Sequence, residues 1–143
     1  MVLRVENIIS AVYRIPVIFI LFLLVATAAN AHHGWGFYGD IVEIEFTVAE
    51  LKLGNPHDRV VATDVENNRW NLLLAPPARN RRFGFDESTL QVGDLIQVTG
   101  AKHSSKLEIK VHCINVDGEN VYTYRYDNGK SSFERLRIDQ SCE

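Results

Sequence analysis

The sequence predicts a mostly β protein: a small, OB-like, partly open Greek-key β-barrel with one short helix, preceded by a signal peptide. Three observations support this fold class. Apolar and polar residues alternate along 42–53, and several shorter strand-like stretches follow. Within this stretch the apolar positions shift by one residue, which is the pattern that a β-bulge produces. A single short helical stretch separates three predicted strands from the next two or three. A small β-sandwich is the alternative.

The first predicted strand is long and bent. Before the parity change its apolar positions are Val42, Ile44, Phe46 and Val48, and after it they are Leu51 and Leu53. A bulge near Ala49 and Glu50 explains the change, because an extra residue in one strand moves the following side chains to the other face. Such a bulge also bends the strand, which a closed ring of strands requires.

The later elements follow from turn and breaker residues. Further strands are expected at 59–65, 69–75, 95–99, 107–116 and 120–125, with a short helix at 78–83. Pro76 and Pro77 end the third strand, because proline has no N–H group to donate to the ladder. Asp117 and Gly118 are typical of a tight hairpin turn.

Between and after these elements the sequence is less regular. Phe85 and Leu90 are expected to plug one end of the barrel, and 101–106 to form a polar loop. His112 alternates with Lys110 and Glu108 along the fifth strand, so we expect it to face solvent.

The first 31 residues have the pattern of a secretory signal peptide. Arg4 and Arg14 precede the apolar run 17–25, and Ala29 and Ala31 are the small residues that a signal peptidase needs. The alternative is a retained membrane anchor, although a spanning helix needs about 20 apolar residues. The predicted organisation is a signal peptide at 1–31, an N-terminal segment of the mature chain at 32–40, the barrel at 41–126 and a polar C-terminal tail at 127–143. We therefore expect a periplasmic or secreted protein.

The charge balance excludes some partners. The chain has 15 Lys and Arg residues and 18 Asp and Glu residues, so its formal net charge is −3. A general nucleic-acid binder neutralises phosphates with basic residues, so we expect no nucleic-acid partner. The same balance argues against a cleaved chain that is held on anionic lipid by basic charge, so we expect no membrane partner. A small ligand or a protein partner remains open.

Cys113 and Cys142 are the two cysteines of the chain. An even count in an oxidising compartment permits one disulfide, which would tie the C-terminal tail to the fifth strand. The alternative is two free thiols, because Cys113 lies on an apolar face and is able to point into the core.

The histidines at the start of the mature chain indicate metal chemistry. Cleavage after Ala31 would leave His32 with a free α-amine beside its imidazole, and these two nitrogens can chelate one ion. His33 adds a second imidazole, and His57 in the turn after the first strand is the candidate for a third. Nitrogen ligands of this kind suit Cu(II), which leads the affinity order for divalent first-row metals. A solvated, metal-free N-terminus is the competing interpretation.

An aromatic segment follows these histidines. Trp35, Phe37 and Tyr38 are either a stacking surface for a sugar or peptide, or a clamp that seals one end of the barrel. The sequence contains no nucleophile elbow, P-loop, zincin helix or paired-thiolate zinc motif. We therefore do not predict an enzyme.

A set of short motifs resembles the uncharacterised DUF6152 family of small exported bacterial proteins. The motifs are 31–34 (AHHG), 55–57 (NPH), Trp70, 82–85 (RFGF) and 90–98 (LQVGDLIQV). The resemblance extends from His32 to Val121 and implies an exported, OB-like small domain of unknown function. It places the histidine pair of the family on His32 and His33. The family usually has an aromatic residue before Asn-Pro-His, where this chain has 51–54 (LKLG).

Overall fold

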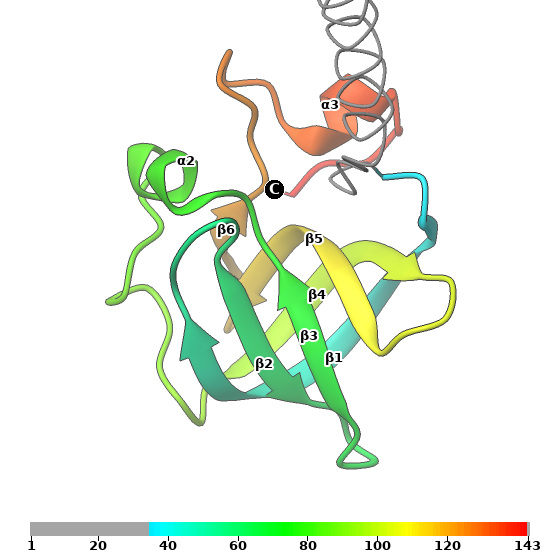
Figure 1. Ribbon diagram of the computed structural model, residues 1–143, viewed down its shortest axis with the longest axis vertical. Helices are drawn as coiled ribbons and strands as arrows, with labels where there is room; N and C mark the ends of the chain where they lie inside the picture. Colours follow the sequence, from blue (N-terminus) through cyan, green and yellow to red (C-terminus); the bar gives the residue numbers. More distant parts are fainter. Residues whose placement is uncertain (1–34, 143) are drawn as a thin grey trace, which may run out of the picture. The chain divides into compact units, whose positions relative to one another are not determined.

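The computed structural model describes residues 35–142. These residues form six strands and two short helices (Figure 1). In chain order the elements are β1 (Tyr38–Lys52), β2 (Arg59–Thr63), β3 (Arg69–Leu73), α2 (Pro77–Arg82), β4 (Leu95–His103), β5 (Glu108–Val116), β6 (Glu119–Thr123) and α3 (Ser132–Leu136). The predicted mostly β fold with a helix between the third and fourth strands is confirmed. The predicted signal peptide lies outside the described residues.

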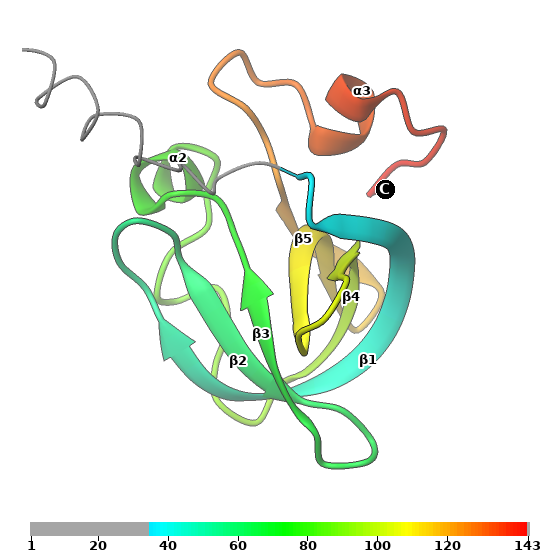
Figure 2. The same ribbon diagram turned by 45° about the vertical axis from the view of Figure 1, so that its right-hand side comes forward.

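All six strands belong to one sheet, which curls into a partly closed ring (Figure 2). The strand order is β3-β2-β1-β4-β5-β6, and a short parallel pairing between β3 and β5 joins the two sides. Five strands therefore close on one another, and β6 extends the sheet beyond β5. This is the connectivity expected of an OB-like, partly open barrel. The β-sandwich alternative is wrong, because these strands do not form two packed sheets.

β1 belongs to both sides of the ring. Its first part pairs with β4 and its last part pairs with β2. Between Val48 and Glu50 the register with β2 shifts by one residue, so Ala49 is the bulged residue predicted from the sequence. Phe46 and Val48 point into the core before the bulge. The bulge lets one strand turn through the corner that closure of the ring requires.

The core lies inside the ring and is built from alternate residues of the strands. Its largest fully buried members include Phe46, Leu72, Leu74, Leu90, Ile96, Ile109 and Ile114. Phe85 and Leu90, which were expected to plug one end of the barrel, are both buried in this core. Gly100 of β4 faces Val111 of β5 at a very close approach, because a Cβ atom there would lie 2.7 Å from Lys110 O and would overlap the Ile109 side chain.

The α2 helix is tied to the turn between β1 and β2. The Asn80 side chain is buried, and its Nδ2 donates to Asp58 Oδ2 at 2.7 Å and to Ala75 O at 2.8 Å. Pro77 is at the start of the helix, where its missing N–H costs nothing. Gly84, with φ of +89°, follows the helix in the left-handed conformation that glycine adopts without strain.

Two loops differ from the sequence-based expectation. The polar loop expected at 101–106 is shorter, because β4 continues to His103, and Ala101 pairs with Ile41 on one side and with Lys110 on the other. The 117–118 hairpin is confirmed, and both Asp117 and Gly118 have the positive φ that its tight turn requires.

The sequence predicted only a polar tail after residue 126, but the C-terminal region is folded and packed. α3 begins with a complete capping box, in which Ser131 and Glu134 satisfy each other's backbone N–H groups. Phe133 in this helix is only 1% exposed. The tail therefore contributes to the packing of the domain.

No helix among residues 35–142 is long and apolar enough to cross a membrane.

Candidate functional site

The outer face of β5 carries an unusual set of buried polar side chains. Against β4, Thr99 pairs with Cys113 and Gly100 pairs with Val111, so His112 is an extra residue in β5. This bulge changes the parity of the strand. Val111 and Ile114 face the core, whereas His112 and Cys113 are buried outside it.

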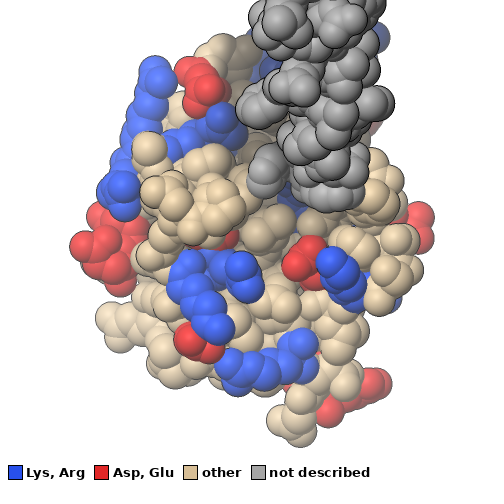
Figure 3. Space-filling view, viewed as in Figure 1, with Lys and Arg blue, Asp and Glu red and all other residues tan. Residues whose placement is uncertain are grey.

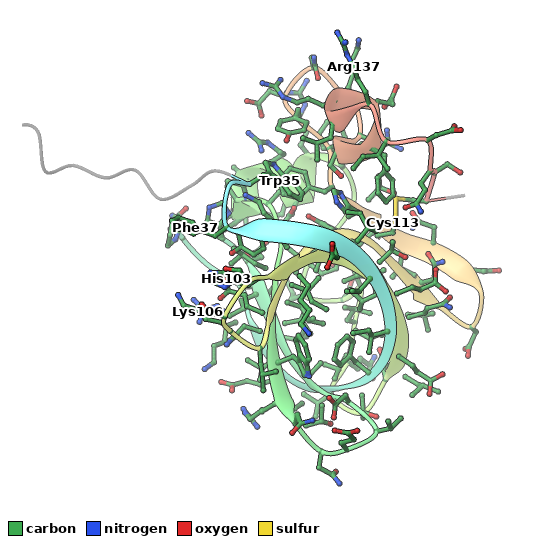
Figure 4. All side chains as sticks on the ribbon, turned by 90° about the vertical axis from the view of Figure 1, so that its right-hand side faces the viewer. Trp35, Phe37, His103, Lys106, Cys113 and Arg137 are labelled. Atoms are coloured by element: carbon green, nitrogen blue, oxygen red, sulfur yellow. A yellow bond between two sulfur atoms is a disulfide. The ribbon has the colours of Figure 1, made fainter. Side chains whose placement is uncertain are left out.

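The prediction that His112 faces solvent is wrong. Its side chain has 0% exposure, because segments from both ends of the described chain cover this face of β5. The imidazole ring lies between two aromatic rings: the Trp35 ring is 4.7 Å away at an interplanar angle of 11°, and the Phe133 ring is 4.3 Å away at 25°. Figure 4 shows Trp35 and Cys113 on the side of the strands that α3 covers.

The two ring nitrogens of His112 have different surroundings. Nδ1 lies 2.5 Å from Ser132 Oγ, whereas Nε2 is buried and has no hydrogen-bond partner within the described part of the chain. Burial, assisted by the positive charge of Lys110, lowers the pKa of His112 to about 4. The imidazole is therefore neutral at neutral pH, which is the form that binds metals.

Trp35 is fixed by several contacts. Its Nε1 donates to the Tyr126 hydroxyl at 3.0 Å, and its ring meets the Tyr124 ring edge to face. The Lys110 ammonium lies 4.6 Å from the centre of the Trp35 ring, within range of a cation–π interaction. These contacts hold the start of the described chain against β5.

Phe37 and Tyr38 surround His103 near the β4–β5 loop (Figure 4). The Tyr38 hydroxyl donates to Glu108 Oε1 at 2.6 Å, and burial and this carboxylate raise its pKa. Phe37 keeps 54% of its surface exposed. Of the three predicted stacking residues, Trp35 and Tyr38 are thus engaged within the domain, and Phe37 presents the most surface to solvent.

His57 occupies the turn between β1 and β2, as expected. Its Nδ1 lies 3.1 Å from Leu74 O. A carbonyl oxygen only accepts, so Nδ1 is the donor of this hydrogen bond. His32 and His33 lie outside the described residues. Within residues 35–142 no three His, Cys, Asp or Glu side chains are grouped in a way that could hold a metal ion.

Comparison with known protein families decides the family. A model described as a family of unknown function, DUF6152, matches residues 21–109, which is more than half of the chain. This chain belongs to the DUF6152 family. The comparison with curated proteins and the comparison with solved structures each found no match. The matched region includes His57 and Trp35, whereas His112 and α3 follow it.

In this DUF6152 chain a disulfide joins the C-terminal region to β5, next to His112. Cys113 and Cys142 are bonded, with their Cα atoms 5.5 Å apart. Cys113 faces outward because it follows the bulge at His112. The bond holds Cys142 next to β5, the strand that carries His112, and Phe133 covers the imidazole ring of that histidine.

The charges on the face of the DUF6152 domain drawn in Figure 3 are mixed, with basic and acidic side chains interspersed. Glu50 forms ion pairs with both Lys52 and Arg69. On α2, Arg79 pairs with Asp127 and lies over the Tyr126 ring.

Proposed function

We propose that this DUF6152 protein is an exported module that holds a Cu(II)-type ion through His32, the first residue of the mature chain. The α-amine and the imidazole Nδ1 of His32 close one chelate ring. His33 adds an imidazole, and His57 is the donor that the sequence offers from the folded domain. The role of such a site is to hold or deliver the ion.

The observation that carries this proposal is the fixed position of Trp35. This residue follows His32 by only three positions, and it is stacked on His112 and hydrogen-bonded to Tyr126. Three residues span at most about 11 Å. His32 is therefore joined by a short stretch of sequence to a residue that packs on the folded domain, which lowers the entropy lost when a donor from that domain completes a site.

Two further features support the proposal. His57 donates through Nδ1 to a backbone carbonyl, which is how many metal-binding histidines are oriented. The Cys113–Cys142 disulfide suits the oxidising compartment that the signal peptide predicts.

The test is calorimetric titration of Cu(II) into mature protein that begins at His32. The matched control is the same protein with the α-amine of His32 acetylated, because an acetylated nitrogen no longer offers the lone pair of an amine. We expect acetylation to weaken binding by more than tenfold. Equal affinity in the two proteins would remove the proposal. The intact mass of the exported protein establishes the cleavage position.

A binding module for a small non-metal ligand or a protein partner is the second candidate. The exposure of Phe37 favours it, since 54% of this aromatic residue remains accessible next to His103. A partner that uses this surface would lose affinity when Phe37 is changed to alanine, while Cu(II) binding would stay the same. A Phe37→Ala protein that keeps full affinity for its partner would exclude this surface.

A further inference from the structure

We propose that the hollow between the end of α2 and the outer edge of β6 binds an acidic segment of a partner protein, whose carboxylates are held by Arg79 and Arg125. On one side the hollow is lined by Arg79 and by Phe83, the C-cap residue of α2. On the other side it is lined by Val121 and Thr123 of β6 and by Arg125. The inference does not depend on the proposed copper site.

The first argument is that the chain itself places a carboxylate at Arg79. Arg79 Nε donates to Asp127 Oδ1 at 2.9 Å, and Arg79 Nη2 donates to Asp127 Oδ2 at 3.3 Å. These two parallel hydrogen bonds are the arrangement with which arginine recognises a carboxylate. The hydrogen bond and the charge of Arg79 lower the pKa of Asp127, and the charge of Arg82 adds to this effect. The position therefore favours an ionised carboxylate.

The two members of this ion pair differ in how firmly they are held. The Arg79 side chain is 20% exposed, and its guanidinium carbon lies 5.8 Å from the centre of the Tyr126 ring. The Asp127 side chain is 77% exposed and belongs to a turn in which Tyr126 N donates to Lys130 O. An ion pair with an exposed partner contributes little stability. A carboxylate from another protein can therefore replace Asp127 at a guanidinium group that is already in position.

The second argument is the gathering of arginine side chains around the hollow. Arg125 lines it and donates through Nη1 to Gly129 O at 3.1 Å. Arg82 is exposed at the end of α2, and the Arg135 guanidinium of α3 lies 4.4 Å from the centre of the Tyr126 ring. Figure 3 shows basic side chains over α2. Like charges that are held close together repel one another, so this surface is complementary to a partner with several carboxylates.

The acidic side chains of the same region leave much of this charge uncompensated. Glu134 is close enough to Arg125 for that charge to lower its pKa, but its Oε2 accepts the Ser131 N–H in the capping box of α3. Arg82, Arg125 and Arg135 form no ion pair within residues 35–142. Their charge is therefore available to an acidic partner.

The third argument is the position of β6, which favours an extended segment over a small anion. Within residues 35–142 β6 has β5 as its neighbour on one side and no strand on the other. Phe83, which is 37% exposed, adds an apolar surface to the hollow. An extended segment along this edge can bond to the backbone of β6 while its acidic side chains reach the guanidinium groups, as in strand addition to other sheets.

The experiment uses the exported protein and two short fluorescent peptides. One peptide alternates glutamate and serine, and the other has glutamine in place of each glutamate. Fluorescence anisotropy gives their affinities at low and at physiological salt. We expect the glutamate peptide alone to bind, and its affinity to fall as the salt concentration rises, because salt screens exposed charges. Equal binding of the two peptides would overturn the inference.

Substitutions of arginine test which residues hold the peptide. Arg79→Gln and Arg125→Gln should each weaken binding of the glutamate peptide about tenfold, as loss of a hydrogen bond between charged groups does. Arg81→Gln is the matched control, because it removes the same charge from an exposed position of α2 that does not line the hollow. Circular dichroism checks that each variant is folded. Equal affinities for all three variants would contradict the assigned site.

Asp127→Asn is a test that misfolding cannot imitate, because the expected result is a gain. The change frees Arg79 from its internal carboxylate, so the affinity for the glutamate peptide should rise about threefold to tenfold. Asp40→Asn is the control for overall charge, since Asp40 is an exposed residue of β1 that does not line the hollow. If both variants bind the peptide like the unchanged protein, Asp127 does not occupy the binding site and the inference is wrong.

Two further measurements identify the occupant and its place. Backbone amide signals of Val121 and Thr123 should shift in NMR spectra when the glutamate peptide is added, and shifts confined to another surface would overturn the inference. Free succinate is the probe for a small anion. If succinate displaces the peptide at concentrations equal to that of the peptide, the hollow takes a small carboxylate and not a protein segment. None of these measurements involves Cu(II), so their failure would leave the terminal chelate untouched.

Discussion

The indole ring of Trp35 lies on the imidazole ring of His112, with centroids 4.7 Å apart and planes inclined by 11°. Phe133 covers the opposite face of the same imidazole at 4.3 Å. One histidine therefore links the start of the described chain to the helix near its end. A substitution of Trp35 or Phe133 should also weaken the packing of the other ring, because both rings lose a stacking partner when the imidazole moves.

Phe133 should be the most important side chain of α3 for stability. It is 1% exposed and stacks on His112, so Phe133→Ala removes a buried ring and leaves a cavity. We expect a loss of about 3–5 kcal/mol in the free energy of unfolding, measured by urea denaturation. Leu136→Ala in the same helix is the control, since Leu136 is 38% exposed and should cost much less. Equal losses in the two variants would contradict the packing described for α3.

The disulfide should stabilise the domain through the loop that it closes. Cys113 and Cys142 are 29 residues apart in sequence, for which the chain-entropy model gives about 3–4 kcal/mol. Replacing both cysteines by serine should lower the thermal midpoint accordingly, and adding a reductant should lower the midpoint of the unchanged protein only. A reductant that shifts both proteins equally would show that its effect is not on this bond.

Gly100 should not tolerate a side chain. A Cβ atom there would lie 2.7 Å from Lys110 O and 3.1 Å from Val111 Cα, both backbone atoms of β5 that cannot move aside easily. We expect Gly100→Ala to destabilise the protein by about 1–3 kcal/mol, as overpacking does. Gly39→Ala is the matched control within a strand, because nothing lies within 4 Å of its added Cβ. The prediction fails if the unfolding midpoints of the two variants agree.

The hydroxyl of Tyr122 should matter for the connection between β3 and α2. It accepts the N–H of Ala75 at 3.0 Å in a buried position. Tyr122→Phe leaves that N–H without a partner, which should cost about 1–3 kcal/mol. Tyr38→Phe is the comparison, since the Tyr38 hydroxyl meets Glu108 in a partly exposed position, where water can replace it. A larger loss for Tyr38→Phe in denaturant unfolding would refute the expected order.

The burial of His112 predicts a dependence of stability on pH. Its pKa is about 4 in the folded protein and near 6.5 in the unfolded chain, so the unfolded state binds the proton more tightly. The stabilising contribution is complete above pH 6.5 and is lost as the pH falls towards 4, by about 3 kcal/mol in total. Unfolding free energies measured between pH 7 and 4 should decline less steeply for His112→Phe, which does not titrate. Parallel declines would contradict a buried neutral His112.

Much of the strand framework was predictable because its signals are local. Alternation in β1 and its change of parity placed the bulge near Ala49, and Asp117-Gly118 placed the last hairpin. Pro76 and Gly84 bracketed the short helix. Each of these signals depends on residues adjacent in sequence, where the backbone conformation and the direction of each side chain are set.

The surroundings of β5 were not predictable in the same way. Alternation with Lys110 suggested an exposed His112, and nothing nearby in the sequence revealed that Trp35 and Phe133 would cover it. One local signal was present for α3, since Ser131 and Glu134 have the spacing of a capping box. Recognising it would have predicted the helix, but not the face on which it packs.

The sequence by itself determined the family, the mostly β character and the positions of the turns, because these follow from side-chain periodicity and backbone preference along a short window. Only the tertiary structure decided that His112 is buried, that Trp35 is immobilised on it and that Cys142 reaches Cys113. Those facts depend on which distant segments meet across the outer face of β5. Burial is a property of the whole packed chain and is not encoded in any one stretch of it.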